Sequence, residues 1–316
     1  MKRTGLLYDK RFLDHLPRAE HPEVPARLTA IYDGIRQRGL LDHLQVIPAQ
    51  AAPRMWIETV HDRDYVDRFE TACRNGSRTF DSPDNQLCAQ TFDVALLAVG
   101  GILDVADRIV AGEIDNAFCA VRPPGHHAEK AKAMGFCYFN NVAVAATYLQ
   151  TQWLIERVAI IDFDVHHGNG TQAIFEDDPT VFYYSIHQHP SFAYPGTGRG
   201  FEEGVQRGAG YTCNTTVLPG QGDDFYREAV EKELRPAMTR FRPQVIIVST
   251  GFDAHADDDM ADVALSTAGY AWMMEEIMKL ADTFADGKLI SVLEGGYCLE
   301  RLPELAADHV QALLQI

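Results

Sequence analysis

The chain has 316 residues, of which 46% are hydrophobic and 23% are charged, a composition typical of a protein with a large core and not of a disordered chain. Its 45 acidic and 28 basic residues give a net charge of −17, which argues against nucleic acid as a partner and weakly favours cationic substrates. Six scattered cysteines without a CxxC pair indicate reduced thiols in a cytoplasmic protein.

Up to residue 115, short apolar runs and helical periodicity predict one strand and three helices. The strand is Leu6–Tyr8, and the helices run from His21–Leu28 to about Arg38, within Pro53–Val60, and over Thr91–Val110. The turn-rich segment Arg74–Gln90 is predicted to be a long loop. No N-terminal apolar run is long enough for a signal peptide, and no helical run is apolar enough to span a bilayer, so we expect no membrane contact.

Beyond residue 115, apolar strands alternate with helices. Strands are predicted at Asn116–Val121, Val158–Asp162, Val181–Ser185, Tyr211–Leu218, Val245–Thr250 and Leu289–Leu293. Helices are predicted at Asn140–Gln152, Asn169–Phe175, Asp223–Phe241, Thr267–Phe284 and Pro303–Leu314, with a glycine-rich loop over 196–210. This order predicts an α/β fold in which helices cover both faces of a parallel sheet. We see no linker and expect one domain over residues 1–316, which is compatible with a homo-oligomer.

Four polar motifs directly follow predicted strands: RPPGHH, DFDVHHGNG, GFDAH and EGGY. Because parallel strands end at the same edge of a sheet, we expect these motifs to converge there. Side chains two apart on a strand share a face, so Asp162, Asp164 and His166 would point one way if the extended backbone continued past Ile161.

Asp164 and His166 are close enough in sequence to chelate one ion, and Asp253 offers a third ligand from another strand. Three N/O ligands with an open position are typical of a catalytic zinc site. The alternative is a buried Asp–His pair joined by hydrogen bonds, which the presence of Asp253 makes less favourable.

His126 and His127 follow a stiff Pro-Pro-Gly turn and are candidates for an acid/base pair. Asp162 and Asn169 are the candidates for orienting their far ring nitrogens. Tyr297, after two glycines, is a candidate for stabilising an oxyanion. A surface histidine pair and a packed tyrosine are the alternatives, and the position of both motifs after buried strands argues against them.

Protein nucleophiles are less well supported. Ser185 and Ser249 end predicted strands, but neither lies in a GxSxG elbow. Cys137 lies in an apolar run, which is typical of an inert buried thiol. A water activated by a metal is therefore the expected nucleophile.

The motifs RPPGHHA, GFCYFNN, DFDVHHGNGT, SIHQHP, STGFDAH and LEGGY occur in the order found in zinc-dependent histone deacetylases. From about His21 to Tyr297 the chain resembles this family, most closely its class II branch and bacterial deacetylase-like amidohydrolases. The resemblance implies an arginase/deacetylase-like α/β domain with a central parallel sheet of eight strands. It implies one Zn²⁺ per chain on Asp164, His166 and Asp253, with a structural K⁺ beneath it near Asp162 and Ser185.

The resemblance further implies the site roles: His126 and His127 as acid/base pair with Asp162 and Asn169 behind them, Tyr297 as polariser of the carbonyl, and a substrate tunnel lined by Gly135, Phe136, Tyr194 and Met260. The implied reaction is hydrolysis of the amide of Nε-acyl-lysine by a metal-bound water. An acetylpolyamine amidohydrolase is the alternative, and the apolar Met260 favours acyl-lysine because a polyamine-selective relative has glutamate there.

Two further functions are less compatible with the sequence. Arginase-type ureohydrolases need a carboxylate two residues after the chelating histidine, where this chain has Gly168. A degenerate deacetylase that only binds its partner would have lost a metal ligand or the tyrosine, and all of these residues are present.

Overall fold

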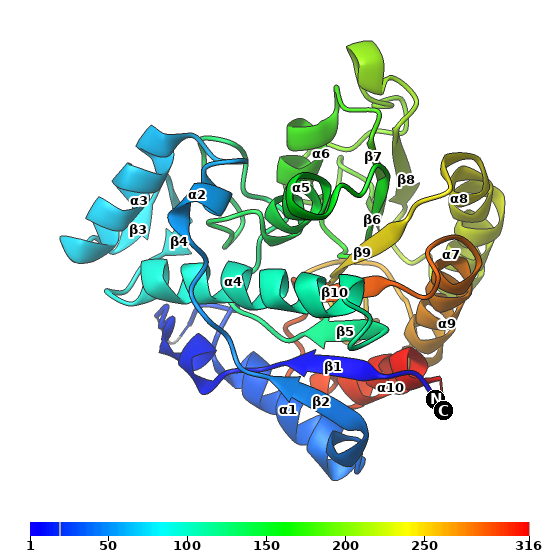
Figure 1. The fold of residues 1–316 in the computed structure, drawn as a ribbon, viewed down its shortest axis with the longest axis horizontal. Helices are drawn as coiled ribbons and strands as arrows, with labels where there is room; N and C mark the ends of the chain where they lie inside the picture. The colour runs from blue at the N-terminus through cyan, green and yellow to red at the C-terminus, as the bar shows by residue number, and fades with distance from the viewer. Residues whose placement is uncertain (19, 316) are drawn as a thin grey trace.

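The computed structural model describes residues 1–18 and 20–315, and within them eight parallel strands form one sheet in the order β2-β1-β5-β10-β9-β6-β7-β8 (Figure 1). The strands are β1 (Thr4–Leu7), β2 (Leu44–Ile47), β5 (Asn116–Cys119), β6 (Val158–Asp162), β7 (Val181–Gln188), β8 (Thr212–Val217), β9 (Val245–Thr250) and β10 (Leu289–Leu293). This confirms the predicted α/β class and the eight-stranded parallel sheet.

Helices cover both faces of the sheet. One layer contains α1 (Ala26–Gln37), α10 (Leu302–Leu314), α9 (Thr267–Phe284), α7 (Asp223–Ala229) and α8 (Arg235–Phe241). The other contains α4 (Thr91–Val110), α5 (Asn141–Trp153) and α6 (Asn169–Phe175). The two ends of the chain lie side by side (Figure 1), where the Lys2 amide donates to the Leu314 carbonyl at 3.0 Å. None of the helices among the described residues combines the length and apolar character that crossing a membrane requires.

Several predicted elements differ from the structure. The edge strand β2 was not predicted, because two of its four residues are exposed and it lacks an apolar run. The predicted loop Arg74–Gln90 contains a small hairpin of β3 (Thr79–Phe80) and β4 (Ser82–Gln86). The predicted helix Asp223–Phe241 is divided into α7 and α8 by a π-helical turn, Val230–Leu234.

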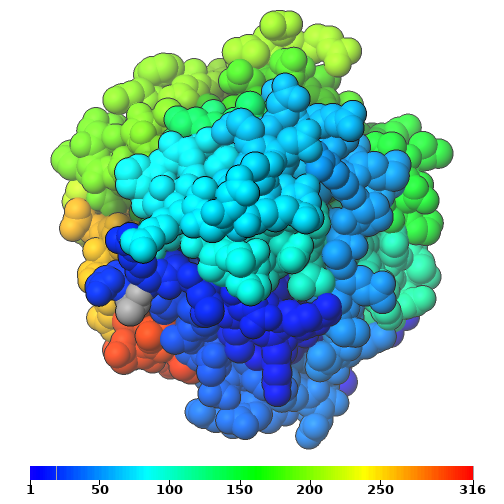
Figure 2. Space-filling view, turned by 90° about the vertical axis from the view of Figure 1, so that its left-hand side faces the viewer, coloured from blue at the N-terminus to red at the C-terminus, as the bar shows by residue number. Residues whose placement is uncertain are grey.

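Two short helices, α2 (Arg54–Ile57) and α3 (Arg63–Arg74), precede the hairpin. Helix α3 was not predicted, although it buries Tyr65, Val66 and Phe69 at helical spacing. With the hairpin it forms the raised surface in the centre of Figure 2, above the N-terminal segment. Single turns of 3-10 helix lie at Lys10–Asp14, Leu41–His43 and Gln206–Gly208.

The order of the strands confirms that the four polar motifs converge. The strands that precede them, β5, β10, β9 and β6, are consecutive neighbours in the middle of the sheet. Each is fully buried, which fits a strand covered by helices on both sides. Strand β7 continues to Gln188, so Ser185 lies inside it and not at its end.

A buried ion network joins the start of the chain to this edge. Glu23 accepts hydrogen bonds from Arg122 on both carboxylate oxygens and from Arg27 at 3.0 Å, and all three side chains are fully buried. Burial alone would raise the pKa of Glu23, but Arg122 and Arg27 outweigh it and hold the pKa at about 2. Glu23 therefore contributes stability that is present above its unfolded pKa and lost as the pH falls toward 2.

Replacing Glu23 by Gln is expected to destabilise the protein by about 3–5 kcal/mol at pH 7, because two buried guanidinium groups lose their shared counter-charge. Since the wild-type contribution of about 3 kcal/mol is lost progressively as the pH falls from about 4.5 to about 2, the difference between wild type and variant should shrink over this range. Urea unfolding at several pH values measures the destabilisation at pH 7 and its decrease at lower pH. The exposed change Glu156→Gln is the control, and an equal effect of the two substitutions would contradict the prediction.

Candidate active site

Three buried side chains bring their ligand atoms together at the carboxyl edge of the sheet. Atoms of Asp164, His166 and Asp253 lie within 4.8 Å of one another. His166 Nδ1 lies 3.2 Å from Asp164 Oδ1 and 3.1 Å from Asp253 Oδ2. The structure thus brings the three predicted ligands into one cluster.

The backbone that delivers these ligands is a series of turns, and not the extended strand that the alternation suggested. Strand β6 ends at Asp162, whose Oδ1 accepts the Asp164 amide at 3.2 Å. Asp164 Oδ1 in turn accepts the His166 amide at 2.9 Å. Each carboxylate accepts a hydrogen bond from the backbone N–H of the residue two positions later, a local pattern that competes with strand geometry. Asp162 therefore faces His126 and lies outside the ligand cluster.

This cluster fits a divalent cation. Asp164 and Asp253 are almost fully buried, and among the described residues His166 is the side chain that hydrogen-bonds to both, beside backbone amides of Val165, His166 and Gly295. Burial and the neighbouring charge of Asp164 raise the pKa of Asp253, because two carboxylates are packed together in a buried site. Gly251 and Gly295 pack so closely that a side chain at either position would collide with Asp164. Carboxylate and imidazole ligands suit a transition metal, zinc included.

His126 is held by Asp162, as the sequence predicted. Its Nδ1 lies 3.1 Å from Asp162 Oδ2, which also accepts the Tyr183 hydroxyl at 3.0 Å. Burial alone would lower the pKa of His126, but Asp164 and Asp162 outweigh it and raise the pKa to about 10. A side chain at Gly168 would collide with Asp162 and Tyr183, so this position has no room for the second-metal carboxylate of a ureohydrolase.

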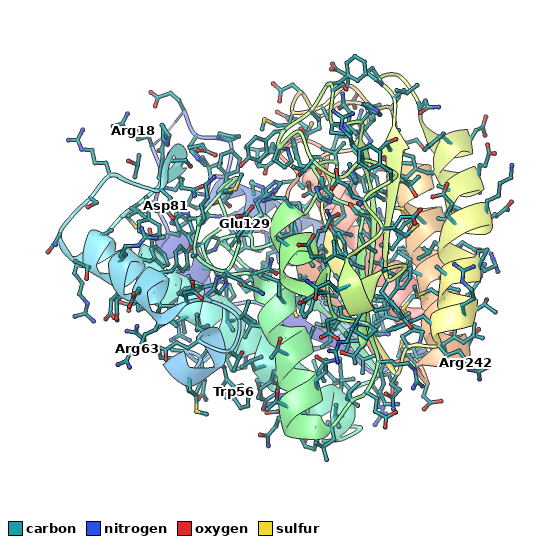
Figure 3. The ribbon with its side chains drawn as sticks, turned by 90° about the horizontal axis from the view of Figure 1, so that it is seen from above. Arg18, Trp56, Arg63, Asp81, Glu129 and Arg242 are labelled. Carbon is teal, nitrogen blue, oxygen red and sulfur yellow. The ribbon has the colours of Figure 1, made fainter. Side chains whose placement is uncertain are left out.

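His127 is held by Asn169 in a defined tautomer. Asn169 Oδ1 lies 2.8 Å from His127 Nδ1, and Asn169 Nδ2 donates to Glu129 Oε1 at 2.8 Å (Glu129 is labelled in Figure 3). Because the Glu129 carboxylate only accepts, the amide oxygen must face His127, which then carries its proton on Nδ1. Burial, with the charges of His126 and His166, lowers the pKa of His127 well below its usual value. His127 is thus a neutral imidazole whose Nε2 can accept a proton.

Tyr297 completes the polar end of the site. Its ring stacks under the Arg27 guanidinium, with Cζ 4.7 Å from the ring centroid, and Arg27 also donates to the Gly296 and Glu294 carbonyls. Burial raises the pKa of the Tyr297 hydroxyl well above its usual value, against the opposing charge of Arg27. The hydroxyl therefore keeps its proton and can donate it in a hydrogen bond.

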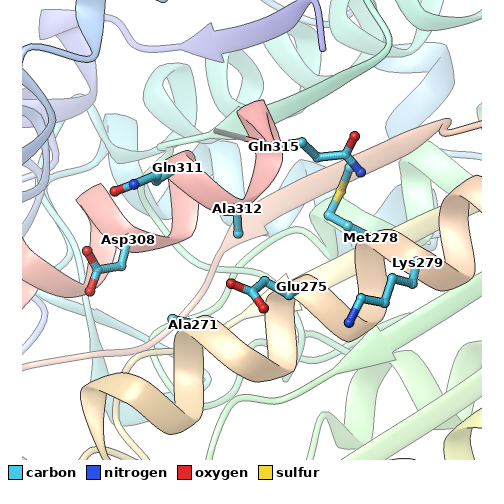
Figure 4. A pocket seen from close by; sticks show the side chains of 8 residues that line it. All are labelled: Ala271, Glu275, Met278, Lys279, Asp308, Gln311, Ala312 and Gln315. Carbon is cyan, nitrogen blue, oxygen red and sulfur yellow. The ribbon is translucent and has the colours of Figure 1, made fainter. Parts of the chain in front are cut away.

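A cavity of about 230 Å³ leads to this end, lined by Asp84, His127, Gly135, Phe136, His166, Tyr194, Met260 and Tyr297. It contains all four residues expected of a substrate tunnel. Gly135 has a φ of +53°, and a side chain there would collide with the His127 ring. Asp84, on β4, was not among the predicted residues, because its segment was read as an irregular loop. A hollow of about 440 Å³ lies between α9 and α10 (Figure 4), and the charged residues that line it, Glu275, Lys279 and Asp308, are exposed or partly exposed.

The protein nucleophiles set aside from the sequence are not favoured by the structure. Ser185 and Ser249 are fully buried, and neither of them lines the cavity that leads to Tyr297. Burial raises the pKa of the Cys137 thiol well above its usual value, which suppresses the reactive thiolate.

Comparison with known proteins decides the family. Residues 21–313 match the sequence profile of the histone deacetylase domain. The chain belongs to the histone deacetylase family. Among the relatives of this deacetylase is a probable deacetylase from Archaeoglobus fulgidus, 39% identical over 300 residues, which cover 94% of this chain and 82% of the relative.

A histone deacetylase-like amidohydrolase from Pseudomonas aeruginosa is 38% identical over 285 residues, covering 90% of this chain and 74% of that protein. The solved HD domain of HDA15 superposes with a TM-score of 0.92 at 36% identity, over 99% of this chain and 88% of that one. These matches confirm the arginase/deacetylase-like fold, and they support hydrolase activity of the deacetylase and amidohydrolase type.

Proposed function

We propose that this deacetylase hydrolyses the amide of Nε-acyl-lysine side chains, with zinc as the ion held by Asp164, His166 and Asp253. The observation that carries the proposal is the cavity of about 230 Å³, whose apolar walls lead to His166, His127 and Tyr297. A lysine side chain can bury its methylene stem in such a passage while its amide reaches the polar end. Zinc bound there would polarise the amide carbonyl and lower the pKa of water.

The roles of the protein side chains follow from their hydrogen bonds. His127, neutral and with Nε2 free of its proton, takes the proton of the attacking water and returns it to the departing amine. His126, whose Nδ1 is held by Asp162 and whose Nε2 lies 3.8 Å from Asp164 Oδ1, tunes the site from beside the proposed metal ligands. Tyr297 donates a hydrogen bond to the developing oxyanion. Asn169 and Asp162 orient the two rings.

The alternative substrate is an acetylpolyamine, which the same machinery would hydrolyse. Asp84 in the cavity lining favours a cationic ligand, whereas Met260 in the same lining favours an apolar one. We expect kcat/KM for an acetyl-lysine peptide to exceed that for acetylputrescine and acetylspermidine by at least about tenfold, because the free ammonium group of a polyamine would lose hydration beside the apolar Met260. Acetate release from each substrate measures the ratio. A higher kcat/KM for either polyamine would overturn the acyl-lysine proposal.

A pair of variants tests whether Met260 sets this ratio. Met260→Glu places a carboxylate on the tunnel wall and should shift the ratio toward polyamines by about tenfold. Met260→Leu, which keeps the wall apolar, should leave the ratio within about threefold of wild type. Equal shifts in the two variants would contradict the role of charge at this position.

A further inference from the structure

Two loops that line the cavity are joined by one buried carboxylate. The loop after β10 carries Tyr297, and the loop after β9 carries Met260. Between them lies Asp258, whose side chain is buried although its neighbours Asp257 and Asp259 are exposed.

The two oxygens of Asp258 serve different loops. Oδ2 accepts the amides of Tyr297 at 2.6 Å and Cys298 at 2.9 Å, while Oδ1 accepts the Met260 amide at 3.1 Å. Among the described residues, no Lys or Arg side chain forms a hydrogen bond or ion pair with this carboxylate, so the three backbone N–H groups take the place of water around it. Charge-assisted bonds of this kind are about twice as strong as neutral ones.

The ring of Tyr297 is fixed separately from its backbone. Arg27 stacks on the ring, and Phe136 meets it edge-on with 6.1 Å between ring centroids. The position of the hydroxyl therefore depends on two supports: the packed ring, and the amide that Asp258 holds. The same carboxylate holds the amide of Met260, which forms part of the tunnel wall.

We propose that Asp258 is a positioning residue. It fixes the backbone of Tyr297 and the backbone of Met260 relative to each other, and so sets both the turnover rate and the acyl-chain preference. This inference rests on the proposed amide hydrolysis, in which Tyr297 contacts the carbonyl and Met260 contacts the acyl-lysine stem. Asp258 itself does not line the cavity and acts only through these two residues.

Two substitutions separate its two functions. Asp258→Ala removes both oxygens, and we expect kcat to fall by about 10–100-fold with KM changed less than about threefold, since displacement of a catalytic group by about 1 Å costs as much. Asp258→Asn keeps one acceptor. Its oxygen should face Tyr297 and Cys298, because the reverse orientation would set its NH₂ against two N–H groups. This variant should keep kcat within about fivefold of wild type but change the ratio of rates for acetyl- and butyryl-lysine peptides.

The matched controls are Asp257→Ala and Asp257→Asn, which make the same changes one residue away on a carboxylate paired with the exposed Arg301. The proposal would be overturned if both Asp258 variants kept the wild-type kcat and the wild-type ratio of rates for acetyl- and butyryl-lysine peptides. Equal losses in the Asp257 controls would also overturn it. If Asp258→Ala does not fold, the acyl ratio of Asp258→Asn decides alone: an unchanged ratio overturns it.

A measurement without substrate distinguishes this inference from the proposed function. Hydrogen–deuterium exchange over residues 294–301 should be at least about tenfold faster in Asp258→Ala than in wild type, with metal content unchanged. If the wild type fails to cleave acyl-lysine, the proposed function is wrong, whereas faster exchange in Asp258→Ala still supports Asp258 as the residue that holds the Tyr297 loop. Unchanged exchange in Asp258→Ala would overturn the positioning role of Asp258 even if the enzyme is active.

Discussion

Replacing Tyr297 by Phe is expected to lower kcat by about 10²–10³-fold while leaving the metal content of the protein unchanged. The substitution removes one hydrogen-bond donor from the place where negative charge develops, and loss of one such donor costs about this much. The Phe ring keeps the volume that packs under Arg27 and against Phe136, so the protein should fold as before. Because burial raises the pKa of the Tyr297 hydroxyl, the wild-type donor stays protonated across the working pH range.

The effect is measured as acetate release at saturating acetyl-lysine peptide, with metal per chain determined by elemental analysis. Tyr194→Phe is the matched control, since it removes a hydroxyl from a second tyrosine of the same cavity. That variant should lose less than about tenfold, because its position is on the wall and outside the polar end. A kcat for Tyr297→Phe within about threefold of wild type would contradict the assigned role.

The convergence of the site could be predicted because the polar residues follow buried strands directly. Each strand is a short apolar run, and parallel pairing places all their carboxyl ends at one edge. The sequence does not give the order of the strands, yet the prediction needed only that the four strands share a sheet. Their positions as consecutive neighbours brought His126, Asp164, Asp253 and Tyr297 closer together than the prediction required.

What the sequence could not predict depends on contacts between distant segments or on local competition for hydrogen bonds. Arg27 supports Tyr297 across 270 positions of the chain, and nothing near either residue indicates the other. The backbone turns at Asp164 because the Asp162 carboxylate accepts a hydrogen bond from the Asp164 amide. The alternation expected of a strand placed Asp162 on the side of the ligands, but in the structure Asp162 faces His126. Asp258 carries no local signal either, since two exposed aspartates flank it.

Replacing Asp253 by Asn is expected to lower kcat/KM by at least about 10³-fold and to remove the stabilisation that metal provides, without destabilising the metal-free protein. Loss of an outer partner of a metal ligand already costs about 10–100-fold in affinity, and a ligand itself should cost more. Asn can still accept the Val165 amide, which lies 3.1 Å from Asp253 Oδ1. It also removes one of two buried like charges, so the metal-free variant should be at least as stable as metal-free wild type.

Thermal unfolding with EDTA and with added zinc separates these effects. Metal at about 100 times its Kd should stabilise the wild type by about 3 kcal/mol, a rise of about 4 °C in Tm, and should leave the Asp253→Asn variant nearly unchanged. The exposed change Asp257→Asn controls for loss of one negative charge and should respond to metal like the wild type. Equal metal-dependent shifts in wild type and Asp253→Asn would contradict Asp253 as a ligand. A large destabilisation of the metal-free variant would instead mean that Asp253 holds the fold through its bonds to Val165 and His166, with the charge repulsion from Asp164 too weak to matter.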